Sequence, residues 1–312
     1  MKEYLFGADV GGTTVKLGVF RTEGILVDKW EIPTRTEDNG ENIIPDIADT
    51  CQNYIAGHDL EKDDFAGIGM GIPGPVKEDG TVQGCVNLGW GFRNVKKEME
   101  KALGIPAYVD NDANAAALGE MWAGGAKGVR NLIMITLGTG LGGGIIINEK
   151  TVNGSDGFGG EIGHITIHPE EEERCGCGRR GCIEQFCSAN GIVRVASRAL
   201  KTYKEDSLLK KIKKFTSKDI FDAAKKKDAF AISQLERFGN DLGLAMSNWA
   251  TMTDPEIFVI GGGVSRAGKA LTDVVGKYYR KYALPGQRDI PIVLATLGND
   301  AGIYGCARLV IG

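Results

Sequence analysis

The chain has 312 residues, of which 42% are hydrophobic and 25% charged, the range of a globular protein long enough for two domains. Its net charge of −4 indicates no basic surface for nucleic acid or anionic lipid. The N-terminal apolar run is too short for a signal peptide and is interrupted by Asp9, and no stretch reaches the length of a membrane span. Seven cysteines, three of them clustered, fit a reducing compartment better than a disulfide framework. We therefore expect a cytoplasmic protein.

Two segments near positions 10 and 140 resemble each other. Residues 4–20 and 131–147 each consist of an apolar run, a glycine-rich turn and a second apolar run. The first turn carries Thr13 and Thr14, and the second carries Thr139. Such a duplication predicts two similar domains that face a shared ligand.

The second turn also contains the pattern G-x-G-x-x-G, at Gly138, Gly140 and Gly143. In a dinucleotide-binding fold these glycines open a helix. Here the β-branched run 145–147 follows, which is typical of a strand. We therefore predict a hairpin rather than a dinucleotide-binding turn. No G-x-x-x-x-G-K-[ST] pattern occurs, which excludes a P-loop.

A third glycine cluster, residues 261–268, follows the apolar run 257–260 and precedes a helical pattern over 269–282. Backbone amides at such a strand-to-helix turn can hold an adenosine or a phosphate group. A single glycine cluster is most often a plain tight turn. Three clusters, two of them internally related, favour a nucleotide site.

The remaining organisation predicts an α/β protein with two closely docked domains. Helices are expected to begin at Asp112 and near Thr216, where a capping pattern precedes an apolar run. Residues 188–250 are predicted to be largely helical. The expected segments also include a strand over 66–76, a strand over 290–296 and a final helix within 299–312. We expect a small domain formed by residues 1–115 plus 300–312, and a large domain formed by 116–299 that carries the metal site and a dimerisation surface.

Histidines and cysteines gather between residues 164 and 184. The pattern C-x-C-x4-C places three thiols close together, and two histidines lie just upstream: Cys175, Cys177, Cys182, His164 and His168. Three thiolates and one imidazole form a closed tetrahedral zinc site. In a strand, His164 and His168 would share one face, so periodicity does not decide between them. A purely structural zinc knuckle or free thiols are the alternatives to a metal that shapes a polar pocket.

The segment 109–120, VDNDANAAALGE, places two carboxylates and an amide where an apolar strand meets a helix. Asp and Asn are the preferred residues for capping a helix N-terminus, so Asp110, Asn111 and Asp112 could have a structural role only. The functional interpretation is that a carboxylate at this strand end accepts a proton from a substrate hydroxyl.

Six motifs occur together and in one order: DVGGTTVKLGVF, GIPGPV, DNDANAAALGE, LGTGLGGG, GEIGH and CGCGRRGCIE. Together they resemble the ROK family of sugar kinases and sugar-responsive repressors. The resemblance spans nearly the whole chain and is strongest to the bacterial ATP-dependent glucokinases, which share the eleven-residue step from His164 to Cys175. It implies the two-domain α/β, actin-like and hexokinase-like (ribonuclease H-like) ATPase fold with a zinc knuckle.

The resemblance also implies a role for individual residues. Asp112 would be the general base. Sugar hydroxyls would be bound by Gly74, Asn111, Asp112, Glu161, His164 and Glu184. ATP and Mg²⁺ would be bound by Asp9, Gly11, Gly12, Thr13, Thr139 and Gly140, with Gly262 and Gly263 behind the adenosine. Structural zinc would be held by His164, Cys175, Cys177 and Cys182.

The expected reaction is transfer of phosphate from ATP to glucose by a homodimer or homotetramer. Other hexoses, namely N-acetylmannosamine, N-acetylglucosamine and fructose, remain alternatives, as does polyphosphate as donor. A regulatory sugar sensor is a third possibility, although the first phosphate loop begins at Asp9 and leaves no room for a preceding helix-turn-helix. One departure from the family pattern is Phe158-Gly159-Gly160 before Glu161, where relatives often have smaller residues.

Overall fold

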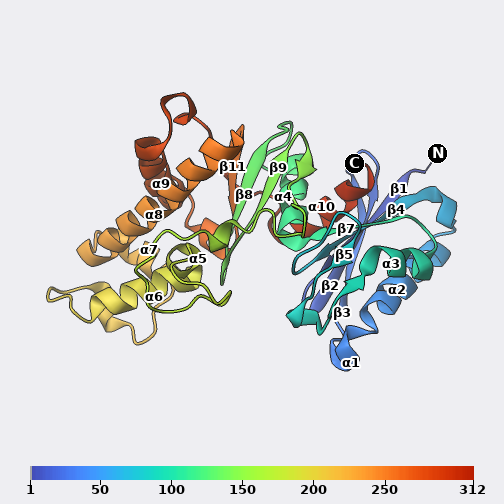
Figure 1. The fold of residues 1–312 in the computed structure, drawn as a ribbon, viewed down its shortest axis with the longest axis horizontal. Coiled ribbons are helices and arrows are strands. Elements are labelled where there is room, and N and C mark those ends of the chain that lie inside the picture. Colours follow the sequence, from blue (N-terminus) through green and yellow to red (C-terminus); the bar gives the residue numbers. More distant parts are fainter. Residues whose placement is uncertain (1) are drawn as a thin grey trace. The chain divides into compact units, whose positions relative to one another are not determined.

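The computed structural model describes residues 2–312 and divides them into two compact units. Unit 1 contains the chain up to Leu132 together with Gly144–Gly160 and Thr296–Gly312, and unit 2 contains Ile133–Gly143 and Glu161–Ala295. The boundary expected after residue 115 falls inside helix α4, Asp112–Ala123, which runs without a break. Figure 1 shows the elements of both units.

Unit 1 is built on a five-stranded sheet with the order β3-β2-β1-β4-β7. Strands β1, β2 and β3 are antiparallel neighbours, whereas β4 and β7 run parallel to β1. The strands of this unit are β1 Tyr4–Val10, β2 Thr14–Arg21, β3 Leu26–Pro33, β4 Phe65–Ile72, β5 Thr81–Val82, β6 Arg93–Asn94 and β7 Ala107–Asn111. Its helices are α1 Glu37–Gly40, α2 Ile43–Gly57, α3 Val95–Leu103, α4 and α10 Ala301–Val310.

The alternation of side chains along β1 builds a core on each face of this sheet. Phe6 packs in a cluster that includes residues of α2 and α3, such as Ile47 and Met99. Leu5, its neighbour in the strand, packs instead with Ile303 of α10. Successive side chains of a strand point to opposite faces, so the two clusters cover opposite faces of the sheet.

Helices α4 and α10 approach each other very closely. A Cβ atom on Gly305 of α10 would lie only 1.5 Å from the carbonyl oxygen of Ala115, and one on Gly119 of α4 would lie 2.1 Å from the carbonyl oxygen of Ala301. Glycine at both positions therefore allows the two helix backbones to touch. This contact fixes α4, whose N-terminus carries Asp112, against the end of the chain.

The second sheet has the order β10-β9-β8-β11-β12. Its strands are β8 Leu132–Leu137, β9 Leu141–Ile147, β10 Lys150–Thr151, β11 Ile257–Gly261 and β12 Ile292–Leu294. The helices of unit 2 are α5 Glu184–Cys187, α6 Ala189–Leu200, α7 Ser217–Lys225, α8 Ala229–Thr253 and α9 Lys269–Tyr282. Within residues 2–312, every helix is too short or too polar to cross a bilayer.

Several sequence predictions are confirmed at this level. The two glycine-rich turns join neighbouring strands, β1 to β2 and β8 to β9. Helix α9 occupies the predicted range 269–282, and α7 begins with the predicted capping box of Thr216 and Asp219. The two-domain α/β fold expected from the ROK resemblance is therefore correct.

Candidate active site and metal cluster

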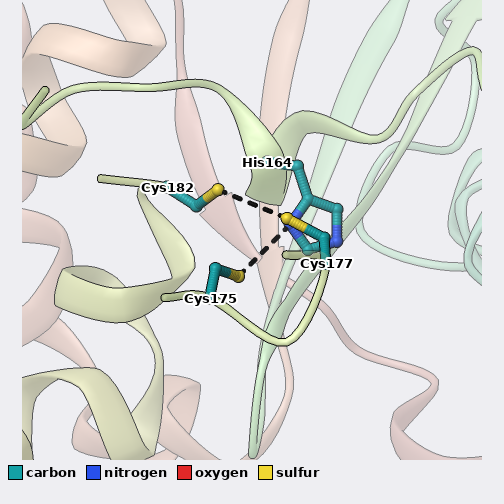
Figure 2. A group of neighbouring side chains, drawn as sticks. All are labelled: His164, Cys175, Cys177 and Cys182. Carbon is teal, nitrogen blue, oxygen red and sulfur yellow. Dashed lines mark hydrogen bonds between the residues drawn. The ribbon is translucent and has the colours of Figure 1, made fainter. Parts of the chain in front are cut away.

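The structure brings one histidine and three cysteines together in unit 2. The ligand atoms of His164, Cys175, Cys177 and Cys182 all lie within 4.8 Å of one another (Figure 2). The His164 Nδ1 atom is 3.8 Å from Cys175 Sγ, and the sulfurs of Cys177 and Cys182 are 3.6 Å apart. This donor set matches that of a closed structural zinc site.

The chain turns tightly to form this cluster. The amide of Cys175 donates to Arg179 O, and the intervening Gly178 has a left-handed backbone with φ of +85°. Gly181 is also left-handed, and a Cβ atom there would lie 2.0 Å from His168 O. Glycines at these two positions therefore let the cysteines converge.

The cluster is electrostatically suited to a divalent cation. Burial and the two neighbouring thiols raise the pKa of Cys182 to about 12. Burial is the larger cause of this shift, and the two neighbouring thiols add to it. The positive charge of a bound Zn²⁺ would offset both the cost of burying thiolates and their mutual repulsion, so that the thiols would coordinate as thiolates.

His168, the rival ligand, is engaged elsewhere. Its Nε2 is 3.1 Å from Asp241 Oδ2, its Nδ1 is 3.0 Å from Glu170 Oε1, and its ring lies against Phe186. The premise that His164 and His168 share one face of a strand was wrong. His164 lies in a 3-10 turn, Ile162–His164, where the chain bends towards the cysteines.

Glu184 links the metal cluster to the second glycine turn. Its Oε2 accepts a hydrogen bond of 3.0 Å from the Leu141 amide, and its Oε1 lies 3.5 Å from Cys175 Sγ. A Cβ atom on Gly140 would lie 2.2 Å from the same carboxylate, so only glycine fits there without a shift. The cluster therefore fixes Glu184, and Glu184 in turn fixes the turn that carries Thr139.

The same turn opens onto a cavity of about 420 Å³ within unit 2. Three segments line it: the second glycine turn, the metal loop, by which we mean residues 164–184 around the metal cluster, and the start of α6. The lining residues include Thr139, Gly140, Glu184, Ser188, Asn190 and Arg194. Ser188 caps α6 by accepting from the Gly191 amide, and the Ala189 amide donates to Gly138 O. A helix N-terminus beside a glycine turn offers the backbone amides and positive potential that an anion requires.

The third glycine cluster lies beside this turn. Gly262 has φ of +80°, and a Cβ atom there would lie 2.5 Å from Leu137 O at the end of β8. Gly263 begins a 3-10 turn that leads into α9, and no atom would obstruct a Cβ on it within 4 Å. Gly262 therefore packs against the end of β8, where the second glycine turn begins, and Gly263 faces open space.

Glu161 lies near the imidazole of His164. The Nε2 of His164 is 3.9 Å from Glu161 Oε2, while the Nδ1 faces Cys175. The two ring nitrogens therefore point towards different partners, as required of a histidine that holds a metal on one side and a polar ligand on the other.

In unit 1, the segment DND forms the junction between β7 and α4. The Asn111 side chain accepts from the amides of Ala113 and Asn114, which caps α4, and donates through Nδ2 to Gly74 O at 3.1 Å. Asp112 is the first residue of the helix, and its Oδ1 accepts from the Ala113 amide. Asn111 is thus the N-cap residue, and the Asp112 carboxylate provides a second acceptor for the Ala113 amide in the first turn.

The strand that leads into the first glycine turn carries a half-buried carboxylate, Asp9. Partial burial raises the pKa of Asp9, while the charge of Lys16 opposes the shift. The Gly11 amide donates to Thr14 O, and Thr34 Oγ1 donates to Gly11 O. A half-buried carboxylate next to a tight turn is suited to a bound cation, which would offset the cost of removing its charge from water.

Sequence reasoning missed two groups of residues. The first comprises side chains around Asp110: Asn114, Thr151 and Asn153. The second comprises two arginines of α6 and two glutamates of the metal loop: Arg194, Arg198, Glu171 and Glu173. Most of these contacts, such as Asp110 with Thr151 and Glu171 with Arg194, join positions far apart in the sequence, so no local pattern could reveal them.

The ROK family model matches residues 5–312. The chain belongs to the ROK family. It is 46% identical to a glucokinase of Halalkalibacterium halodurans over 97% of this chain and 94% of that protein. It is 36% identical to a glucokinase of Streptomyces coelicolor over 97% of this chain and 96% of that protein. A ROK glucokinase from Streptomyces griseus, solved in complex with glucose and AMPPNP, superposes with a TM-score of 0.74 at 34% identity and 98% coverage of both chains.

Proposed function

We propose that this ROK protein is a glucokinase, which transfers the terminal phosphate of ATP to glucose and forms glucose 6-phosphate. The observation that carries the proposal is the 46% identity to a glucokinase over nearly the whole of both chains. The site chemistry agrees with it. Phosphoryl transfer depends on positioning and charge neutralisation more than on covalent chemistry, and the chain supplies glycine turns and carboxylates for both.

Asp112 is the proposed general base. It would take the proton of the attacking sugar hydroxyl as phosphate is transferred. The remaining proposed sugar ligands are Gly74 and Asn111 of unit 1 with Glu161, His164 and Glu184 of unit 2. A neutral sugar presents only hydroxyl groups, so carboxylate, amide and imidazole groups are suitable partners.

We propose that the nucleotide is bound by the glycine clusters. Asp9, Gly11, Gly12 and Thr13 would serve the phosphates in unit 1, as would Thr139 and Gly140 in unit 2, with Gly262 and Gly263 behind the adenosine. The 420 Å³ cavity beside Thr139 supports this assignment, since it combines a glycine turn with a helix N-terminus. Mg²⁺, when bound with ATP, neutralises phosphate charge. Asp9 is the residue that we propose lies beside the ion.

His164, Cys175, Cys177 and Cys182 would hold a structural Zn²⁺. The ion would supply stability and orientation rather than a reactive group, because all four coordination positions would be filled by the protein. We further propose a cytoplasmic enzyme, where ATP is available, that assembles as a homodimer or homotetramer.

The test is a comparison of kcat/KM for glucose, mannose, fructose, N-acetylglucosamine and N-acetylmannosamine with ATP and Mg²⁺. We expect glucose to be the best substrate. N-acetylglucosamine replaces the 2-hydroxyl and would leave a buried polar group unpaired, which discriminates strongly. If an N-acetylated sugar outperforms glucose, the enzyme is a ROK kinase for that sugar. Absence of turnover with every sugar would favour a regulatory sugar sensor. Replacing ATP by polyphosphate in the same assay identifies the donor.

A further inference from the structure

The carboxylate of Asp110 has no role in the proposed reaction, although it lies two residues before Asp112. It sits at the end of β7 and is only 2% exposed. Its Oδ1 accepts from the Asn111 amide at 2.6 Å, from Asn114 Nδ2 at 3.0 Å and from Asn153 Nδ2 at 3.2 Å. Its Oδ2 accepts from Thr151 Oγ1 at 2.7 Å. This one buried side chain therefore ties three pieces of unit 1 together.

The bonds around Asp110 form a closed network. Asn114 donates to Asp110 and also to Asn153 Oδ1, at 3.1 Å. All these donors are uncharged, and burial outweighs their hydrogen bonds, so the pKa of Asp110 is raised. A buried carboxylate without a cationic partner is costly to the fold. A carboxylate at this position needs a reason other than stability.

The segment that is bonded to Asp110, residues 151–157, also contacts the loop that contains Gly74, a proposed sugar ligand. Residues 151–153 continue to Gly157, whose left-handed backbone packs against Val76; a Cβ atom there would lie 2.6 Å from the Val76 amide. Asp156 of the same segment pairs with Lys77 at 2.8 Å. Val76 and Lys77 follow Gly74, the residue whose carbonyl oxygen binds Asn111. The segment 151–157 therefore connects the start of α4 with the loop that contains Gly74.

We propose that Asp110 and Asn153 are positioning residues for the phosphoryl transfer. Asp110 fixes the backbone at Asn111 and holds the segment 151–157 against the start of α4. That arrangement sets the direction of Asn111 and Asp112 and the place of the Gly74 loop. The proposal rests on the proposed glucokinase function for its kinetic test, whereas its structural test is independent of activity.

The kinetic test uses Asp110→Asn, which keeps the shape of the side chain but turns two acceptor oxygens into one acceptor and one donor. We expect kcat to fall about 10- to 100-fold, the size of effect that a small misplacement of a reacting group produces. The KM for glucose should rise while the KM for ATP stays close to the wild-type value. Asn153→Ala, which removes a single partner, should give a smaller loss of the same kind.

An exchange variant separates positioning from a general loss of structure. Asn153→Asp alone places two carboxylates in hydrogen-bond contact, and we expect it to lose more activity than Asn153→Ala. Asp110→Asn combined with Asn153→Asp restores one carboxylate facing one amide, so kcat should recover above that of Asn153→Asp alone. Asp228→Asn is the matched control. Asp228 is a buried carboxylate that caps α8 in unit 2, and its substitution should lower the melting temperature without changing kcat.

The structural readout is hydrogen exchange. Amides of residues 151–157 and of the first turn of α4 should exchange faster in Asp110→Asn, with unit 2 unchanged. A kcat within about twofold of the wild type, or unchanged exchange over 151–157, would overturn the proposal. If Asp110→Asn does not fold, Asn153→Ala carries the same two measurements. If wild-type protein fails to phosphorylate glucose, the proposed function falls, and the exchange result still decides the positioning role.

Discussion

The side chain of Asn111 fixes both the start of α4 and the loop that contains Gly74. Its oxygen caps the helix and its nitrogen binds Gly74 O, so both ends of the amide are used by the protein itself. The cap holds the first turn of the helix in place, and this turn includes the next residue, Asp112. The sequence indicated Asp112 correctly as the first helical residue. It could not indicate Gly74 O as a partner of Asn111 without a family resemblance, because that bond joins residues 37 positions apart.

Asp112→Asn tests the proposed base. We expect the fold and most of the glucose affinity to be kept, while kcat falls by roughly two to four orders of magnitude, the contribution of a positioned base. Steady-state kinetics and glucose titration on the purified variant give both values. Asp49→Asn, at an exposed position of α2 in the same unit, is the control and should keep a kcat near that of the wild type. A near-normal kcat in Asp112→Asn would exclude the role.

Glu171 makes an acid-sensitive link between the metal loop and α6. Burial disfavours its charge, but hydrogen bonds from the Glu173 amide and from Arg198 and Arg194 outweigh burial and lower its pKa to about 2. Because the folded-state pKa lies below the ordinary value of 4.5, the ionised carboxylate stabilises the fold at pH values above 4.5. This contribution is lost as the pH falls from 4.5 towards 2.

Glu171→Gln should therefore show a weaker pH dependence of the unfolding free energy than the wild type in this acidic window. Its stability relative to the wild type should be lowest above pH 4.5 and should approach parity as the pH falls. Denaturant titrations at several pH values measure this. Glu172→Gln, at an exposed neighbour, should keep the wild-type slope. Parallel curves for wild type and Glu171→Gln would show that the carboxylate gives no such contribution.

At the scale of elements, the sequence was most informative where apolar runs are long and glycines mark their ends. Both glycine hairpins and α9 were predicted with nearly correct limits. The metal loop was harder. His164 was considered as part of a strand, yet Gly163 presses against Leu141 O, where a Cβ would lie 1.8 Å away, and the chain turns instead. That turn depends on β9, a partner distant in sequence, so local periodicity could not reveal it.

The contact of α4 with α10 gives a prediction at this scale. Gly305→Ala forces a Cβ into the backbone of α4, and we expect a loss of roughly 1–3 kcal/mol in unfolding free energy, as for other overpacked sites. Gly276→Ala is the matched control. It is also a helical glycine, but its Cβ would meet only the flexible end of Arg280 at 3.4 Å, so alanine should be neutral or stabilise by about 0.5–1 kcal/mol. Equal effects of the two substitutions in chemical denaturation would contradict this account.

At the scale of the whole molecule, the sequence predicted two domains, and the limits given for them stay a prediction. The structure groups Gly144–Gly160 with unit 1, and no local pattern in these residues marks that assignment. That assignment depends on long-range bonds such as Asp110 to Thr151 and Asn153. The pattern of apolar residues identifies helices and strands, whereas hydrogen bonds between distant segments decide to which unit each helix or strand belongs.

The metal cluster lies wholly in unit 2, so metal removal should act on that unit. We expect one zinc per chain by metal analysis, and loss of it in Cys182→Ser and His164→Ala but not in the control His168→Ala. Because metal binding contributes directly to folding free energy, chelation should speed hydrogen exchange in the loop 164–184 and α5 while leaving α2 and α3 protected. Zinc-free purified protein, or loss of zinc in His168→Ala alone, would refute the assigned ligand set.

The position of α10 bears on how the protein is made. Gly7 of β1 is in contact with α10, where a Cβ would lie 2.2 Å from Ile303 O, so the first strand completes its packing only with the last helix. During synthesis on the ribosome, β1 emerges early but must wait for residues 301–310. Residues 161–295 of unit 2 are complete before then and can fold first. A nascent chain halted before α10 would thus carry unit 2 complete but leave Leu5 and Phe20 of the N-terminal sheet uncovered, and exposed apolar surface of this kind favours aggregation.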